Sequence, residues 1–172
     1  PDPLPLLPAR PEGLIPLPGF MKDADLIFVD PPWNSVNLNT FYTKADRTDY
    51  PDSFERFYKR LFGCIREIAP HTCYVEVGKQ YLAEFILEMK GTFKHVTFYN
   101  SMYYRRRENI NYVICGSRKR IGKKPLDYMD EEDIIKWVCE NETYDCIGDL
   151  CMGRGLVGWY AYRVGKRFVG TE

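Results

Sequence analysis

The stretch LIFVDPPW, residues 26–33, decides how this sequence folds and what it can bind. Four apolar residues bounded by charge predict a short buried strand over 26–29. Asp30 then lies at the carboxyl end of that strand, where open α/β sheets bind their ligands. The two prolines stiffen the turn and carry no N–H, so the turn offers mainly hydrogen-bond acceptors. Together with the flat ring of Trp33, these acceptors suit a planar ring that bears an exocyclic amine. A core tryptophan after a Pro-Pro turn is the plainer interpretation.

Composition and charge indicate one soluble globular domain. The chain has 172 residues, 45% of them apolar, and its 24 basic residues balance its 24 acidic ones. A neutral chain has no overall cationic field, so binding of nucleic acid would rely on a local patch. No apolar run approaches the roughly 18 residues of a membrane span, and no signal-peptide pattern opens the sequence. We therefore expect a cytoplasmic protein with no membrane partner.

Proline, cysteine and histidine usage refine this expectation. Most of the 12 prolines fall in the first 20 residues, which predicts an extended arm over 1–22 and one domain over 23–172. The six cysteines form no C-x-x-C pair and lie mostly in apolar runs, so we expect buried free thiols. With only two histidines and no cysteine pair, we expect no metal site.

Strand and helix signals alternate along the chain. Strands are expected at 23–30, 73–77, 93–99, 110–115, 143–149 and 166–171. Helices are expected from the Asp52–Glu55 capping pair to Pro70, over 79–90 up to Gly91, over 130–141, and after the C-terminal glycines to about 164. Residues 34–50 show no clear period and are interpreted as a long loop, either a substrate-binding lid or ordinary surface.

This alternation predicts an α/β fold: a doubly wound, mostly parallel sheet. The segments 93–99 and 110–115 are too close for a crossover helix, so they should form an antiparallel hairpin at the edge.

A second motif near the end of the chain indicates a nucleotide-like ligand. Gly153, Gly155 and Gly158 spell G-x-G-x-x-G between an expected strand and a helix, where backbone N–H groups are free. Glu172 lies at the end of the next strand, where a carboxylate binds ribose hydroxyls. NAD is the first candidate, but the motif lies too late in the sequence for the rest of a dinucleotide fold. Asp149, just ahead of the loop, suits an ammonium group, so S-adenosylmethionine fits better.

The two motifs predict one shared crevice. In a doubly wound sheet, the strand before Asp30 and the strand before the glycine loop should be neighbours at the switch point. A sulfonium methyl donor and an amine-bearing ring would then meet at the carboxyl edge of the sheet.

Basic residues concentrate in a third region of the sequence. Eight cations occur within residues 105–124, interleaved with tyrosines, and such a patch suits phosphates and unstacked bases. A solvated loop is the alternative. The candidates for nucleic-acid contact are Arg105, Arg106, Arg107, Arg118, Lys119 and Arg120, with Tyr42 from the 34–50 loop.

These motifs resemble those of the amino-methyltransferases that act on exocyclic amines of nucleic-acid bases. The Asp30–Trp33 turn matches their [D/N/S]-P-P-[Y/F/W] motif, and 149–155 matches D-x-F-x-G-x-G with Cys151 in place of the aromatic residue. Lys124-Pro125 is similar to the Lys-Pro that precedes the family's cofactor strand. The motif order is typical of the circularly permuted β group of DNA methyltransferases, and of RNA adenine methyltransferases with D-P-P-W. The resemblance covers residues 25–172.

The resemblance implies a function and a set of site residues. It implies S-adenosylmethionine as cofactor and direct methyl transfer to the N6 amine of adenine, in a flipped-out or unpaired base, with DNA preferred over RNA. The implied catalytic residues are Asp30, Pro31, Pro32 and Trp33. The implied cofactor-binding residues are Lys124, Pro125, Asp149, Cys151, Met152, Gly153, Arg154, Gly155 and Glu172, together with Asp30.

Departures from the family pattern leave alternatives open. Only nine positions separate Cys115 from Lys124, so the usual target-recognition segment is nearly absent. The next strand and helix of the sheet are not seen after Glu172. We therefore expect a minimal enzyme, a homodimer, or an enzyme with a recognition partner, placed on nucleoid or phage DNA if the source is bacterial. An RNA adenine methyltransferase, a catalytically inert subunit and an NAD enzyme are the alternatives.

Overall fold

The computed structural model describes residues 16–47 and 53–172, and within these ranges seven strands form one sheet. The spatial order of the strands is β5-β3-β4-β2-β1-β6-β7. Their bounds are β1 Leu26–Val29, β2 Thr72–Val77, β3 His95–Tyr103, β4 Arg106–Ser117, β5 Met129–Asp130, β6 Cys146–Asp149 and β7 Arg167–Gly170. The α-helices are α1 Ser35–Lys44, α2 Phe54–Ile68, α3 Leu82–Thr92, α4 Glu131–Asn141 and α5 Leu156–Arg163, and the 3₁₀ turns are η1 Gly19–Asp23 and η2 Lys79–Tyr81.

The sheet confirms the expected α/β class. Strands β2, β1, β6 and β7 pair in parallel, and the β3–β4 hairpin pairs antiparallel, with β4 also antiparallel to β2. The short β5 pairs in parallel with β3 outside the hairpin. Strands β1 and β6 are direct neighbours, as the switch-point argument requires, because Leu26 pairs with Ile147 and Ile27 with Gly148.

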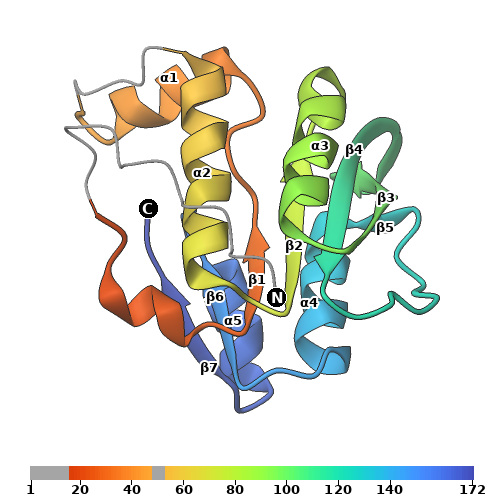
Figure 1. Ribbon diagram of the computed structural model, residues 1–172. Helices are drawn as coiled ribbons and strands as arrows, with labels where there is room; N and C mark the ends of the chain where they lie inside the picture. The colour runs from red at the N-terminus through yellow and green to blue at the C-terminus, as the bar shows by residue number, and fades with distance from the viewer. Residues whose placement is uncertain (1–15, 48–52) are drawn as a thin grey trace.

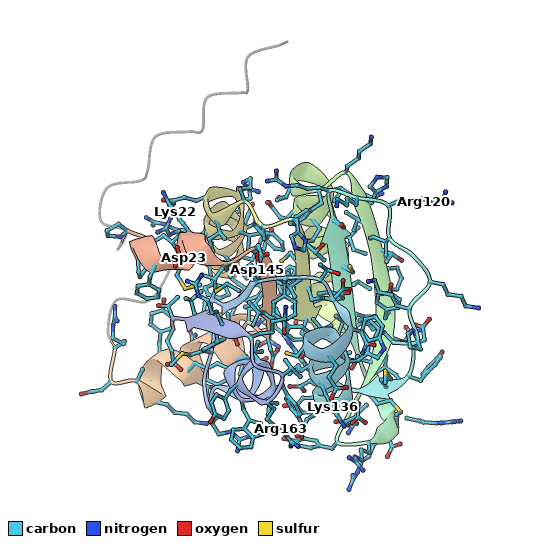
Figure 2. All side chains as sticks on the ribbon, turned by 90° about the horizontal axis from the view of Figure 1, so that it is seen from below. Lys22, Asp23, Arg120, Lys136, Asp145 and Arg163 are labelled. Atoms are coloured by element: carbon cyan, nitrogen blue, oxygen red, sulfur yellow. The ribbon has the colours of Figure 1, made fainter. Side chains whose placement is uncertain are left out.

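Helices cover both faces of the sheet (Figures 1 and 2). Helices α2 and α3 pack on one core cluster, and α4 and α5 pack on the other. Alternate residues of β1 enter the two clusters, since Ile27 and Val29 belong to the first and Leu26 and Phe28 to the second. A strand buried on both faces has one continuous apolar run, which explains the LIFV pattern.

Residues 34–50, expected to be an irregular loop, contain α1 instead. The Asn34 side chain accepts a hydrogen bond from the Asn37 amide at 2.9 Å and so caps the helix. Only Leu38 of α1 is buried, so the segment shows no apolar stripe from which a helix could be predicted.

Helix ends also differ from the expectation. Ser53, not Asp52, caps α2 by accepting from the Arg56 amide at 3.1 Å, and Asp52 lies outside the described residues. The expected helix over 79–90 is η2 followed by α3, and α3 runs through Gly91 to Thr92. The Thr92 hydroxyl donates a hydrogen bond to the Glu88 carbonyl. Gly91 therefore lies inside α3, and the predicted glycine cap is not formed.

The hairpin strands are longer than expected, and β5 was missed. Tyr104 and Arg105, both with positive φ (55° and 56°), form the two-residue turn between β3 and β4. Near this turn the two strands extend beyond the core, and their residues there are mostly polar. The sequence of these strand ends therefore lacks the apolar alternation that marks a strand.

The expected arm and the cysteines can also be compared with the structure. Leu17 and Met21, from the segment expected to be an arm, are buried in the core, while residues 1–15 of that segment lie outside the described ranges. All six cysteines are free thiols, and five of them are buried. In the described residues, no helix is long and apolar enough to cross a membrane.

Candidate active site at the carboxyl edge of β1 and β6

The turn after β1 holds Trp33 in a defined position. The indole Nε1–H donates to Asp30 Oδ1 at 3.0 Å. The ring lies over Gly78, where an added Cβ would come within 3.2 Å of Trp33 Cε3. The Tyr103 ring packs edge-on at 5.6 Å between centroids. Trp33 is therefore fixed by a polar contact with Asp30 and by two apolar contacts from β3 and the end of β2.

The glycine loop after β6 is tied to the end of β7. Asp149 Oδ1 accepts from the Cys151 amide at 2.9 Å, and the Met152 amide donates to the Thr171 carbonyl at 3.1 Å. Gly155 has φ of 77° and begins α5, in a left-handed conformation that glycine adopts without strain. Gly153 also has a positive φ, of 45°. The loop thus has the backbone geometry that close approach to a ligand requires.

Gly158 has a packing role in the same motif. A Cβ at this position would come within 2.8 Å of the Phe168 ring, so the glycine allows α5 to lie close to β7. This matches the role of the third glycine in nucleotide-binding βα units.

The two motifs meet, as the sequence predicted. Adjacent β1 and β6 place Asp30 and Asp149 at neighbouring carboxyl ends, toward the top of Figure 1. Burial raises the pKa of Asp149 to about 7, and the charges of Asp30 and Glu172 contribute to that rise. Burial raises the pKa of Asp30 to about 6, against the lowering effect of the Trp33 hydrogen bond. The pairing of β1 with β6 therefore brings the carboxyl groups of Asp30 and Asp149 to the same edge of the sheet.

Two further carboxylates, which the sequence analysis missed, complete the site. Carboxyl oxygens of Asp30, Glu76 and Glu131 lie within 4.8 Å of one another. Burial, followed by the charge of Asp30, raises the pKa of Glu131 to about 7. The sequence signal for Glu76 was a glutamate within the mostly apolar strand TCYVEV. Because side chains alternate between the two faces of a strand, this glutamate could equally have been exposed.

Such a cluster of acidic groups suits a positively charged ligand. An organic cation such as a sulfonium or ammonium group would neutralise the same charge.

The basic residues of 105–120 do not form one patch. Arg105, Arg106 and Arg107 lie at the turn and start of β4, beyond the carboxyl end of β2. Arg118, Lys119 and Arg120 follow the other end of β4, and Figure 2, seen from below, shows Arg120 at the rim of the molecule. The 12-residue strand between the groups is about 36 Å long. Only the first group lies at the edge that holds Asp30.

Contacts of each basic group support this division. The Arg105 amide donates to Asp130 Oδ2 at 2.7 Å, directly before Glu131, so the hairpin turn is attached beside the site. The Arg118 guanidinium instead donates to the carbonyls of Pro70 and Ala69, both at 3.2 Å, at the end of α2. Arg118 therefore has a structural partner far from the glycine loop.

Lys124 and Pro125, expected to bind the cofactor, are not brought to the glycine loop, and Tyr42, expected to contact nucleic acid, packs inward. Lys124 forms a half-buried ion pair with Glu142 and lines a 490 Å³ cavity beside Thr72, at the amino ends of the parallel strands. Pro125 is exposed next to it. Tyr42 is half-buried in α1 and packs against the core. The cavity is at the edge opposite to the two motifs.

Comparison with known proteins bears on the fold. No known protein family matches the sequence, and no curated protein does. Among solved structures, the chain resembles M1.HpyAVI (TM-score 0.56, 14% identity, 87% of this chain and 80% of that chain) and the M1.HpyAVI–SAM complex (0.56, 12%, 87% and 82%). It also resembles TTHA0409, a presumed DNA modification methylase from Thermus thermophilus complexed with S-adenosyl-L-methionine (0.60, 14%, 88% and 82%).

The chain has a Rossmann-like methyltransferase fold. The likeness extends over most of each chain. At 12–14% identity it concerns the fold alone, and the function must be argued from the residues of the site.

Proposed function

We propose that this protein is an S-adenosylmethionine-dependent DNA methyltransferase that methylates the exocyclic N6 amine of adenine. The observation that carries the proposal is the meeting of the Asp30–Trp33 turn and the glycine loop at adjacent ends of β1 and β6. Two of the similar solved structures contain S-adenosylmethionine, and one is described as a DNA modification methylase, which supports the cofactor and the polymer. The motif order further supports a circularly permuted enzyme of the β group.

The proposed cofactor position follows from the charges and the backbone of the loop. The Gly155 amide donates to the Met152 carbonyl at 2.7 Å, so the amides of Gly153 and Arg154 take the carboxylate of the methionyl group. Asp149 faces its ammonium group, and Glu172 accepts hydrogen bonds from the ribose hydroxyls. The sulfonium then lies toward Asp30, where the acidic cluster balances its positive charge.

The proposed reaction is direct transfer in line from sulfur to nitrogen. Asp30 and the Pro31 carbonyl accept hydrogen bonds from the amine and stabilise the positive charge that develops on it. The base must leave its stack or be unpaired to reach this site. Trp33, held by Asp30 and Gly78, supplies the apolar wall against which the ring lies. Much of the acceleration comes from holding nitrogen, methyl and sulfur in line.

The β3–β4 turn is the proposed contact with the nucleic-acid backbone. Arg105, Arg106 and Arg107 extend from the edge that holds the site, beside the exposed Tyr104. Phosphate contacts from such a turn hold the polymer without reading its sequence. Because only residues 118–128 separate β4 from β5, we propose that a second copy or a partner protein supplies target recognition.

Methyl transfer to defined polymers tests the proposal. Purified protein is incubated with tritiated S-adenosylmethionine and duplex DNA, single-stranded DNA or RNA, and the product nucleoside is identified by mass spectrometry. We expect N6-methyladenine in DNA. We expect Asp30→Ala to bind the cofactor in calorimetry with near-normal affinity and to lose at least about 100-fold in turnover, because the amine loses its acceptor.

Each alternative has its own outcome in these measurements. Methylation of RNA in preference to DNA would assign the protein to the RNA adenine methyltransferases, which share the D-P-P-W motif. No heat of binding with S-adenosylmethionine would indicate an inert subunit. Protection against thermal unfolding by NAD, and not by S-adenosylmethionine, would indicate a dehydrogenase. Turnover of Asp30→Ala equal to that of the wild type would refute the proposed catalytic role.

A further inference from the structure

Glu76 is the most unusual buried group in the protein. It lies in the middle strand β2 with 0% of its surface exposed. Neither of its carboxyl oxygens has a hydrogen-bond partner of ordinary geometry among the described residues. An isolated carboxylate in such a position is several kcal/mol less stable than one in water, so a buried acid of this kind is normally neutral or paired.

The position of Glu76 follows from the strand register. Val29 of β1 pairs with Val75 of β2, so the next residues along the two strands, Asp30 and Glu76, are side by side. Each lies two residues after a member of the same core cluster, Phe28 or Tyr74, so both face the α4 side of the sheet. The carboxyl oxygens of Asp30 and Glu76 lie within 4.8 Å of each other. Asp30 is thus a strong acceptor close to Glu76, beside it on the neighbouring strand.

Among the residues that the structure describes, the other groups that act on Glu76 do not provide a positive charge. Glu131 faces it from α4 and Asp149 from β6, and both are acidic. On the β4 side, Val113 pairs with Glu76, and Asn111 lies two residues before Val113 on the same face. The Asn111 carboxamide is buried and without a hydrogen-bond partner among the described residues. Arg154 acts on Glu131, one step further away.

These surroundings favour the protonated form of Glu76. Burial raises its pKa well above the usual value, and the negative charge of Asp30 raises it further. Two carboxyl groups this close cannot both be ionised in a dry site, so they share one proton. Asp30 is the more exposed partner and has a hydrogen bond from Trp33, so the negative charge resides on Asp30.

We propose that Glu76 is a positioning residue that donates a hydrogen bond to the Asp30 carboxylate, so that the pair faces the target amine with a single negative charge. This inference rests on the proposed function and assigns it a residue outside both motifs. As a neutral donor, Glu76 keeps Asp30 ionised and aimed at the amine. The same pair then receives the proton that the methylated nitrogen must lose.

The proton and electron balance of the step is simple. The nitrogen lone pair forms the N–C bond, and the C–S bond breaks with its electron pair remaining on sulfur. The nitrogen, now positively charged, gives one proton to the Asp30 carboxylate. The Asp30–Glu76 pair becomes neutral, and it returns the proton to water after the products leave. No oxidant, reductant or further reactant takes part.

Two substitutions at Glu76 separate a neutral donor from a charged base. Glu76→Gln keeps the shape and an N–H donor, so we expect turnover within about threefold of the wild type and an unchanged acid limb in the profile of kcat against pH. Glu76→Ala removes the donor. We expect about a 100-fold loss of turnover at neutral pH and an acid limb moved to higher pH, because Asp30 loses a hydrogen bond that favours its charged form. Glu84→Gln, on α3, is the control and should match the wild type.

The outcomes that would overturn the inference are distinct. A Glu76→Gln enzyme as inactive as Asp30→Ala would show that Glu76 acts as a charged base. An acid limb moved to lower pH in Glu76→Gln would show that Glu76 is ionised beside Asp30. A fully active Glu76→Ala enzyme would show that Glu76 has no role. Calorimetry with S-adenosylmethionine confirms that each variant is folded. If Glu76→Ala does not fold, the profile of kcat against pH for Glu76→Gln decides alone.

A spectroscopic readout separates this inference from the proposed function. We expect the infrared difference between the wild type and Glu76→Gln to show the carbonyl stretch of a protonated carboxylic acid. This signal requires no methyl transfer, so it stands even if the wild type methylates none of the polymers. A carboxylate band in its place would overturn the inference while leaving the methyltransferase activity intact.

Discussion

At the scale of single residues, the position of Trp33 depends on the absence of a side chain at residue 78. The indole ring lies over Gly78, and its N–H is within 3.0 Å of Asp30. Gly78 has φ of −77°, which any residue adopts, so the backbone itself does not require glycine there. The close contact with the ring therefore accounts for the glycine. A side chain at this position would change the wall of the site and the direction of the Asp30 carboxylate.

The first prediction concerns Gly78→Ala. The added methyl group would be 3.2 Å from Trp33 Cε3, so the ring must shift by a few tenths of an ångström and its bond to Asp30 weakens. We expect kcat to fall about 10-fold in the tritiated-methyl assay, with little change in S-adenosylmethionine affinity, because small displacements of positioning groups are costly in catalysis.

Gly91→Ala is the matched control for Gly78→Ala. A Cβ at Gly91 meets nothing within 4 Å, and residue 91 lies within α3, where alanine is a better helix former. We expect a small gain in thermal stability and wild-type turnover. Equal turnover of the two variants would contradict the role assigned to the contact between Gly78 and Trp33.

At the scale of elements, β4 separates two groups of arginines that look like one cluster in the sequence. Arg105 and Arg106 lie beside the N-terminus of α4, whereas Arg118 bonds the carbonyls at the end of α2. A cation at a helix C-terminus stabilises the helix through its free carbonyls and its dipole. The first group is therefore available to a polymer, and Arg118 is engaged in the fold.

Paired substitutions of these arginines give the second prediction. We expect Arg106→Ala to weaken DNA binding several-fold and to lower the salt dependence by about one phosphate contact, with no loss of stability. We expect Arg118→Ala to lower the free energy of unfolding by about 1 kcal/mol and to leave DNA affinity unchanged. Fluorescence anisotropy at several salt concentrations and urea unfolding measure the two effects, and the reverse pattern would contradict the division.

The same contrast shows what the sequence could predict. Asp30 and Gly153 each follow a short apolar run, and parallel strands end at one edge, so their meeting was predictable. Helix α1 was not, because Leu38 is its single buried residue. The two arginine groups are about 12 positions apart, and no local pattern shows that a straight strand keeps them at opposite edges. Glu76 was missed because strand alternation does not reveal a neighbour on the next strand.

At the scale of the whole molecule, the fold gathers acidic groups at one edge, where Arg154 partly offsets the charge at Glu131. Asp30, Glu131 and Asp149 have pKa values raised to about 6, 7 and 7, in each case mainly by burial. A group whose pKa is raised by folding stabilises the protein fully below its unfolded pKa, and this contribution is lost as pH rises through the folded pKa. The unliganded protein should therefore lose stability between about pH 4 and pH 7.

The third prediction isolates one of these groups. Asp149→Asn keeps the oxygen that accepts from Cys151 but cannot ionise. Relative to the wild type, we expect this variant to gain about 2 kcal/mol in free energy of unfolding at pH 8 and almost nothing at pH 4. Urea unfolding at several pH values without cofactor measures the free energy of unfolding of both proteins. The other titrating groups are the same in both, so their contributions cancel in the difference. A gain that is equal at both pH values would contradict the raised pKa of Asp149.

The pairing of β1 with β6 joins segments about 120 residues apart, and this has a consequence for synthesis of the protein. A nascent chain emerges from the ribosome with the Asp30–Trp33 turn early and the glycine loop late. Contacts between such distant segments form only after the intervening chain has been ordered, which makes them late events in folding. A partly translated chain therefore holds the Asp30–Trp33 half of the candidate site without the glycine loop. The complete site arises in one step, when the last strands join the sheet.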